Sequence, residues 1–196
     1  PEGFVAEKTI DASSKFVCPG FVDLGARLRE PGEEHKATIE SELFAAAAGG
    51  FTTVCCLPDT NPVIDTPAVI ELIAQRANQV KGSRVKCIGA LTQNLEGKIL
   101  AEMRALKEIG CIAVSNANIP ILDSSVLLHA LEYAATLDLL VFLQAKDPWL
   151  DSLGVMHEGT ASIRQGLGGI PSASELIGLA RDLELVRTAG AKAHFR

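Results

Sequence analysis

Long hydrophobic runs and clusters of positive charge are both absent from this 196-residue sequence. No apolar stretch reaches the roughly 18–20 residues that cross a bilayer, so no transmembrane helix is predicted. Acidic residues outnumber basic ones by 24 to 18, and no run of Lys and Arg occurs. Neither a phosphate backbone nor anionic lipid would be neutralised, so nucleic acid and membrane are not expected as partners. Residues 1–3 carry no signal-peptide features, which favours a cytoplasmic protein.

A disulfide framework is also missing. The cysteines are odd in number, two are adjacent, and most lie inside apolar runs: Cys18, Cys55, Cys56, Cys87 and Cys111. This usage is typical of buried, reduced thiols in a cytoplasmic protein. No Cys-x-x-Cys pair occurs, so a structural zinc knuckle is not expected either.

What the sequence does contain is a regular alternation of short apolar runs and helical patterns. The runs are rich in Val, Ile, Leu, Phe or Cys, which is typical of strands covered on both faces. Strands are predicted at 16–24, 52–57, 85–91, 112–114, 139–143 and 191–195, and helices at 37–48, 67–80, 98–109, 124–137 and 172–188. Repeated strand–helix units predict an α/β fold with a parallel sheet and right-handed crossovers.

Two architectures hold such a sheet, and the sequence favours the barrel. No Gly-x-Gly-x-x-Gly follows the first strand, so a doubly wound dinucleotide-binding fold has no support. A closed eight-stranded barrel usually takes about 250 residues. We therefore expect a partial (β/α)8 TIM-type barrel, truncated at both ends. Residues 1–18 are expected to be a lead-in segment or the end of a small β domain, residues 19–196 the first five to six β/α units, and residues 147–171 the longest connection.

The stretch from Pro19 to Gly32 is the most informative part of the sequence. It begins Pro-Gly-Phe-Val-Asp and ends Arg-Glu-Pro-Gly. This resembles the first-strand signature of dihydroorotases, which belong to the cyclic amidohydrolase superfamily. Residues 45–62 are similar to the family's next helix and second strand, and residues 157–171 to its long loop. The resemblance covers nearly the whole chain and implies a barrel of the metal-dependent hydrolase type.

The sequence departs from the family pattern at the metal ligands. The resemblance implies two histidines on the first strand, where this chain has Gly25 and Arg27. A metal-site carboxylate of the family falls on Asn116 or Ala117, and a ligand histidine falls on Gln144. Glycine offers no side chain, and a guanidinium has no free lone pair and is repelled by a divalent ion. We therefore predict that these positions are degenerate, that no zinc is bound and that no residue is catalytic.

Two substrate-binding positions are predicted to be vestigial. Arg29 matches the arginine that grips the substrate carboxylate in the family, and it can equally form a structural ion pair. Asp59 replaces an asparagine and would repel an anionic substrate. For Arg27 we expect a carboxylate partner, Asp23 or Asp147, which would leave a fixed cation in place of the metal.

Three functions stay open at this point. The ligand losses are similar to those of non-catalytic dihydroorotase-like chains that associate with aspartate transcarbamoylase in some bacteria. The resemblance thus implies a scaffold for the aspartate transcarbamoylase catalytic chain in pyrimidine biosynthesis, present as a homodimer within a larger hetero-oligomer. One alternative is an active zinc-dependent cyclic amidohydrolase of dihydroorotase, hydantoinase or allantoinase type with substitute ligands. The other is a sensor in which Arg27, Arg29 and Lys146 hold a pyrimidine intermediate without turning it over.

Overall fold

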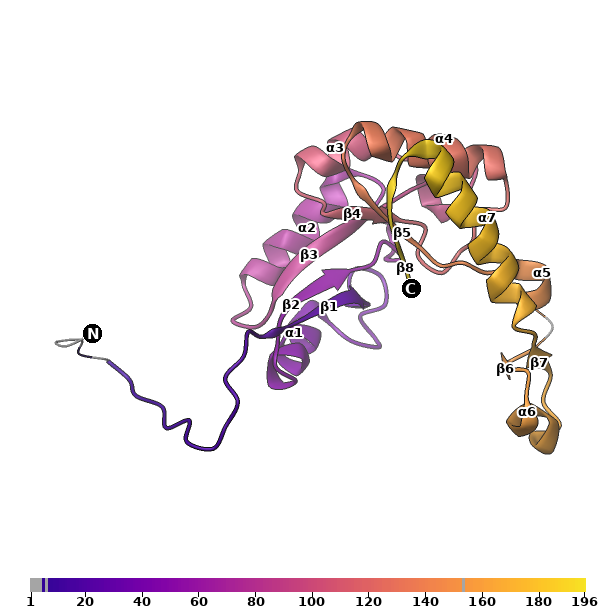
Figure 1. Ribbon diagram of the computed structural model, residues 1–196. Coiled ribbons are helices and arrows are strands. Elements are labelled where there is room, and N and C mark those ends of the chain that lie inside the picture. Colours follow the sequence, from indigo (N-terminus) through magenta and orange to yellow (C-terminus); the bar gives the residue numbers. More distant parts are fainter. Residues whose placement is uncertain (1–4, 6, 153) are drawn as a thin grey trace.

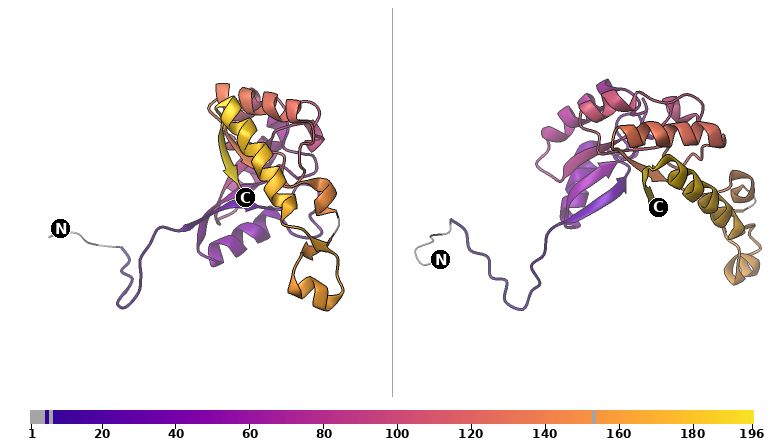
Figure 2. Two further views of the ribbon diagram at one scale, coloured as in Figure 1. Left: turned by 45° about the vertical axis from the view of Figure 1, so that its right-hand side comes forward. Right: turned by 45° about the horizontal axis from the view of Figure 1, so that its top comes forward.

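A curled sheet of parallel strands, with helices along its outer side, forms the body of the molecule (Figure 1). The computed structural model describes residue 5, residues 7–152 and residues 154–196. Residues 1–4 and 6, which open the predicted lead-in, lie outside the described part, as does residue 153. The described residues 7–20 form an exposed segment with no helix or strand, leading up to the sheet (Figure 2).

The sheet has six strands in the order β1-β2-β3-β4-β5-β8, and every neighbouring pair is parallel. Their bounds are Phe21–Ala26 (β1), Phe51–Cys56 (β2), Arg84–Ala90 (β3), Ala113–Ser115 (β4), Leu140–Leu143 (β5) and Lys192–Phe195 (β8). Consecutive β/α units wind a curled parallel sheet, which is part of a TIM-type barrel as predicted. The strand predicted at 16–24 begins later, at Phe21, because pairing with β2 starts there.

The crossover helices cover the outer face of the sheet. They are Ile39–Ala48 (α1), Pro67–Asn78 (α2), Met103–Glu108 (α3), Ser124–Thr136 (α4) and Ala173–Ala189 (α7). The Asp123 side chain caps α4 by accepting a hydrogen bond from Ser125 N at 2.8 Å. Gly190 ends α7 with φ of 62°, a left-handed conformation that glycine adopts without steric cost. Among the described residues, no helix is both long and apolar enough to cross a membrane.

The middle strands β2–β5 are packed on both faces, which explains their apolar character, whereas Phe21, Val22 and Leu24 of β1 are exposed. Between the sheet and the helices lie fully buried side chains such as Leu43, Ile73 and Leu131. The inner face of the curl has its own cluster, formed by Cys55, Leu57, Ile88, Ala113 and Phe142. Burying one such large apolar side chain stabilises the fold by about 1.5–3 kcal/mol, so the apolar runs are sufficient reason for this architecture.

The helix predicted at 98–109 is shorter than expected and starts only at Met103. The backbone of residues 99–101 is engaged elsewhere, because Gln93 N donates to Ile99 O at 2.8 Å and Ala101 N donates to Leu91 O at 3.1 Å. A helix cannot use those same groups. The tertiary pairing therefore overrides the local helical pattern.

The longest predicted connection, 147–171, is more ordered than a plain loop. It contains the short helices Pro148–Asp151 (α5) and Thr160–Gln165 (α6). Between them and after them, Met156–His157 (β6) and Gly169–Ile170 (β7) form a separate two-stranded parallel sheet. This small unit projects from the body of the molecule near the start of α7 (Figure 1).

Glu30 ties the segment after β1 to two helices. Its carboxylate is only 6% exposed. Oε1 accepts from Arg76 Nη1 of α2 at 2.5 Å, and Oε2 accepts from the Ile39 N–H at the start of α1 at 2.8 Å. An acidic group at a helix N-terminus also interacts favourably with the helix dipole. This contact fixes the chain that leads away from the mouth of the barrel.

Replacing Glu30 by Ala should therefore destabilise the full-length protein by about 2–3 kcal/mol, since it leaves a buried N–H without an acceptor. Denaturant unfolding measures this free energy. The matched control is Glu96→Ala, which removes an exposed pair with Lys98 and should cost at most about 0.5 kcal/mol. Equal costs for the two substitutions would contradict the assignment of Glu30 as a buried tie.

Candidate functional site: the carboxyl edge of the sheet

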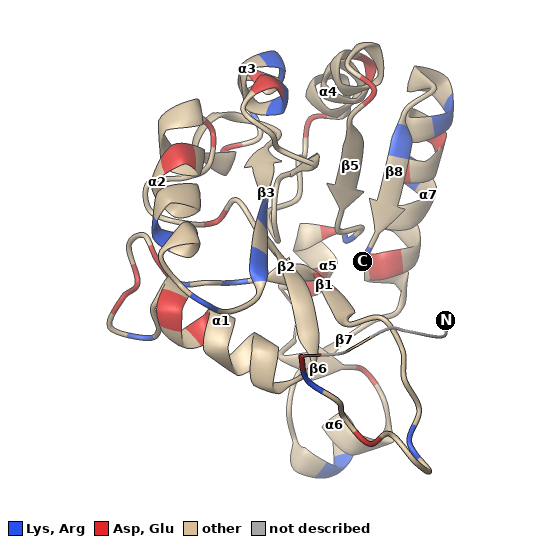
Figure 3. Cartoon of the chain, turned by 90° about the vertical axis from the view of Figure 1, so that its left-hand side faces the viewer, with Lys and Arg blue, Asp and Glu red and all other residues tan. Residues whose placement is uncertain are grey.

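The predicted site residues gather at the carboxyl ends of the strands, the edge that carries function in TIM-type barrels. Gly25 lies near the end of β1, and Arg27 and Arg29 follow that strand. Asp59 follows β2, Asn116 and Ala117 follow β4, and Gln144 and Lys146 follow β5. On the side seen in Figure 3, basic and acidic residues are interspersed over helices and loops rather than separated into fields.

Arg27 and Asp59 form an ion pair between the chain segments that follow β1 and β2. Arg27 Nε lies 2.6 Å from Asp59 Oδ2, and the two side chains are 30% and 26% exposed. The pair therefore lies at the mouth of the curl, partly screened by water, and contributes up to about 1 kcal/mol to stability. Its consequence for the site is greater, because a predicted metal-ligand position and a predicted substrate position neutralise each other.

The prediction that Arg27 pairs with Asp23 or Asp147 was wrong. Asp23 Oδ1 accepts the backbone N–H of Gly25 at 2.8 Å, and Asp147 Oδ1 accepts that of Leu150 at 3.0 Å, where it caps α5. Both carboxylates thus serve their own local backbone. Asp59, on the neighbouring strand end, is the carboxylate that Arg27 reaches.

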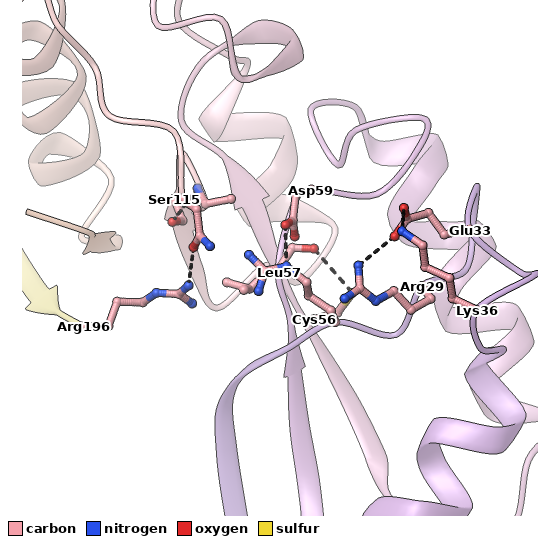
Figure 4. A network of polar contacts seen from close by, with 11 residues as sticks. Arg29, Glu33, Lys36, Cys56, Leu57, Asp59, Ser115 and Arg196 are labelled. Carbon is pink, nitrogen blue, oxygen red and sulfur yellow. Dashed lines mark hydrogen bonds and ion pairs between the residues drawn. The ribbon is translucent and has the colours of Figure 1, made fainter. Parts of the chain in front are cut away.

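A second arginine, which the sequence analysis missed, reaches the same place. Arg196 directly follows β8, and its Nη2 donates to Asn118 Oδ1 at 2.8 Å; Figure 4 shows the Arg196 side chain with this contact as a dashed line. A Cβ atom built on Gly25 would lie only 2.8 Å from Arg196 Nη1, so the guanidinium occupies the space above that glycine. Strand alternation could have found Arg196, since residues 192, 194 and 196 must share one face of β8.

Burial lowers the pKa of Arg196, and the neighbouring Arg27 guanidinium lowers it further. Asp59 and Asp23 act in the opposite direction and raise this pKa. Two guanidinium groups therefore share the mouth of the barrel with two carboxylates. The positive and negative groups offset one another, so the charge at this place is balanced by side chains of the chain itself.

Asn116 is a structural amide. It is 5% exposed, and its Nδ2 donates to Leu95 O at 3.1 Å and to Ile119 O at 2.9 Å. Its Oδ1 accepts from Thr92 Oγ1 at 2.7 Å. Ala117, beside it, is buried and has φ of 51°. These contacts tie the loop after β4 to the segment after β3, and they leave the amide without a free oxygen to offer a metal.

The segment after β5 supplies an amide and a cation. Gln144 Oε1 is buried and has no hydrogen-bond partner among the described residues. Lys146 Nζ lies 2.7 Å from Asp151 Oδ2 of α5, so its charge is paired. A neutral amide oxygen is a weaker metal ligand than the histidine that the family pattern implies at Gln144.

Arg29 forms the structural ion pair rather than lying free for an anion. Its Nη1 lies 2.7 Å from Glu33 Oε2, and its backbone has φ of 63°. Lys36 also bonds to Glu33, and these two cations, Lys36 first, lower the pKa of that carboxyl. In Figure 4 this group lies to one side, with Asp59 between it and Arg196.

The donor chemistry at this edge does not fit a zinc centre. Zinc needs about four donors from histidine, cysteine or carboxylate, and these five positions supply a glycine, a methyl group, a guanidinium and two amides. Nowhere in the described part of the chain do three His, Cys, Asp or Glu side chains form a group that could hold a metal ion. What the arrangement can do is link strand ends through arginine contacts.

Comparison with known proteins identifies the family and agrees with the fold. The profile of the family described as Dihydro-orotase-like matches residues 14–196. The chain belongs to the dihydroorotase-like family. A "Dihydroorotase-like protein" of Pseudomonas putida is 49% identical over 100% of this chain and 46% of its own length. A "Dihydroorotase" of Syntrophobacter fumaroxidans is 46% identical over 94% of this chain and 42% of its own length. The chain thus spans less than half the length of these curated relatives.

Solved structures agree on the fold of this dihydroorotase-like chain. An L-hydantoinase (dihydropyrimidinase) from Arthrobacter aurescens superimposes with a TM-score of 0.77 at 22% identity, over 98% of this chain and 44% of that one. A dihydroorotase from Saccharomyces cerevisiae superimposes with a TM-score of 0.56 at 14% identity, over 90% and 47%. At such identities the likeness establishes the partial amidohydrolase-type barrel and nothing about substrate.

Four of the five cysteines belong to the core and should be chemically silent in the folded protein. Burial raises the pKa of Cys87 to about 11 and that of Cys111 to about 12, and it raises the pKa values of Cys55 and Cys56 as well. Only the thiolate is alkylated, and a raised pKa keeps the thiol protonated through pH 8.

Iodoacetamide at pH 8 should therefore label the exposed Cys18 and spare the four buried thiols, a pattern that peptide mass spectrometry reads directly. Labelling in denaturant provides the control, since all five should then react. Rapid modification of Cys55 or Cys56 in the folded protein would show that the strand β2 is not buried as described.

Proposed function

We propose that this chain is part of a pseudo-dihydroorotase, a cytoplasmic, non-catalytic subunit that scaffolds aspartate transcarbamoylase in pyrimidine biosynthesis. The observation that carries the proposal is the pair of arginines at the mouth of the barrel. Arg27 is bonded to Asp59, and Arg196 lies over Gly25, where the family's first-strand histidines would meet a metal. The proposed subunit is a homodimer within a larger hetero-oligomer and holds no zinc.

The loss of chemistry follows from the groups that occupy the ligand positions. Cyclic amide hydrolysis in the family relies on a metal-activated water, and a metal lowers the pKa of that water toward neutrality. Arg27 stands where the family has a ligand, and a guanidinium has no lone pair to donate to a metal. Its pair with Asp59 also engages a carboxylate that would otherwise be free to bind a cation.

The retained fold supports a role in assembly. The apolar strands and the helix contacts form the barrel, while Gly25, Arg27 and Gln144 at its carboxyl edge all depart from the ligands that the family pattern implies. The site can lose its chemistry while the fold is kept, because the residues that stabilise the core are not the residues that form the site. The Pseudomonas relative named "Dihydroorotase-like protein" supports the same interpretation.

One observation favours the alternative, an active zinc-dependent cyclic amidohydrolase with substitute ligands. The Syntrophobacter relative is named "Dihydroorotase" and is 46% identical to this chain. Substitute ligands would include Asp23 and Asp59. Asp23 is bonded to the Gly25 backbone and Asp59 to Arg27, so both would have to exchange their present partners.

The assembly proposal predicts a stable complex between the full-length protein and the aspartate transcarbamoylase catalytic chain of the same organism. The two should co-elute at micromolar concentration in size-exclusion chromatography, with a mass above that of either protein alone by light scattering. Each protein run alone is the control. Separate elution of the mixture at that concentration would count decisively against the scaffold.

The proposal also predicts that restoring the first-strand histidines is not enough. The double variant Gly25→His/Arg27→His should show no dihydroorotate turnover above background with added zinc, because Asn116 and Gln144 still lack the family's donors. Turnover is followed by absorbance, with an active dihydroorotase as the positive control. Measurable activity of the double variant would show that only the first strand had kept the site silent.

A further inference from the structure

We propose that Arg196, directly after β8, is a clasp at the mouth of the barrel, and that its guanidinium holds the ends of β8, β1 and β4 together where a metal holds strand ends in metal-bearing relatives. The proposal rests on the part of the proposed function that gives this mouth no metal. It concerns the stability of the barrel mouth and is independent of any partner protein.

The reach of Arg196 is the first observation. Among the described strands, β1 and β8 stand at opposite ends of the sheet order and are not hydrogen-bonded to each other. Arg196 nevertheless extends from β8 until its Nη1 lies over Gly25 of β1, 2.8 Å from where a Cβ atom would be. Its Nη2 is bonded at the same time to Asn118 in the loop after β4. One side chain from the end of β8 thus packs against β1 and bonds to the loop after β4.

The small size of residue 25 is the second observation. A glycine in a strand interior weakens the strand, and it is often found where another group approaches closely. Gly25 lies in β1 and does not adopt the positive φ that would require a glycine. The backbone conformation thus gives no reason for glycine at position 25. The close approach of the Arg196 guanidinium does give one, because a larger side chain would collide with it.

The charges around the clasp fit this role. Arg27, with Asp59 bonded to it, faces Arg196 from β1 and β2, and Asp23 faces it from β1. The two carboxylates offset the repulsion between the two guanidinium groups. Positive and negative side chains therefore alternate at the mouth. The positive charge belongs to arginine side chains of the chain and not to a bound metal ion.

The test is a set of thermal-unfolding midpoints measured on variants of the full-length protein. Gly25→Ala should lower the midpoint by about 1–3 °C when Arg196 is present, because the added methyl group displaces the guanidinium from Asn118. In an Arg196→Met background the same substitution should raise the midpoint slightly, since Ala restricts the unfolded chain more than Gly does. The effect of one substitution therefore changes sign with the residue at 196.

Asn118→Asp provides an independent second arm that does not alter the strand. It converts a neutral acceptor into a carboxylate, so it should raise the midpoint when Arg196 is present and not in Arg196→Met. Arg187→Met, at the exposed end of α7, is the matched control and should leave the midpoint nearly unchanged.

Either of two results overturns the clasp: an identical effect of Gly25→Ala in both backgrounds, or an Asn118→Asp effect that does not depend on residue 196. Midpoints repeated with EDTA and with zinc separate this outcome from a failure of the proposed function. A zinc-dependent midpoint for the unmodified protein would refute the metal-free mouth, whereas loss of the sign change without a zinc effect would refute only the clasp.

Discussion

The convergence of parallel strands at one edge is the constraint on which the rest of this structure depends. It places Arg196 against Gly25 and Asn118, with Asp59 close enough to affect its charge, although these residues lie far apart in sequence. In a metal-dependent barrel that proximity assembles a set of donors. Here it assembles two guanidinium groups and their oxygen partners, and the positive charge that a metal would bring is already supplied by the chain.

Much of this arrangement could be predicted from the sequence. Strands covered on both faces appear as continuous apolar runs, and the helices between them appear as apolar residues repeating every three to four positions. The location of the site followed as well, since motif residues come directly after the strands. The shortened α3 could not be predicted, because its first residues hydrogen-bond to a segment before it in the chain. The order within residues 147–171 was missed for the same reason, since β6 pairs with β7 across α6.

The partners of individual charged side chains were the least predictable feature. Arg27 was expected to pair with Asp23 or Asp147, yet both carboxylates accept backbone N–H groups close in sequence. Such local hydrogen bonds compete strongly for Asp and depend on backbone geometry that the residue types alone do not specify. Arg196 was missed because no family motif marks it, although its place on β8 directs it to the mouth. The stability of the apolar core, by contrast, does not depend on which partners these charged side chains have. A barrel can therefore keep its fold while the chemistry of its site changes.

The metal content of the purified full-length protein, measured by elemental analysis after dialysis without added zinc, tests the central claim most directly. A mouth filled by arginine side chains should retain less than roughly a tenth of a metal ion per chain, because no set of donors compensates for the repulsion. One or two tightly held metal ions per chain would contradict the account and would make an active amidohydrolase with substitute ligands the better description.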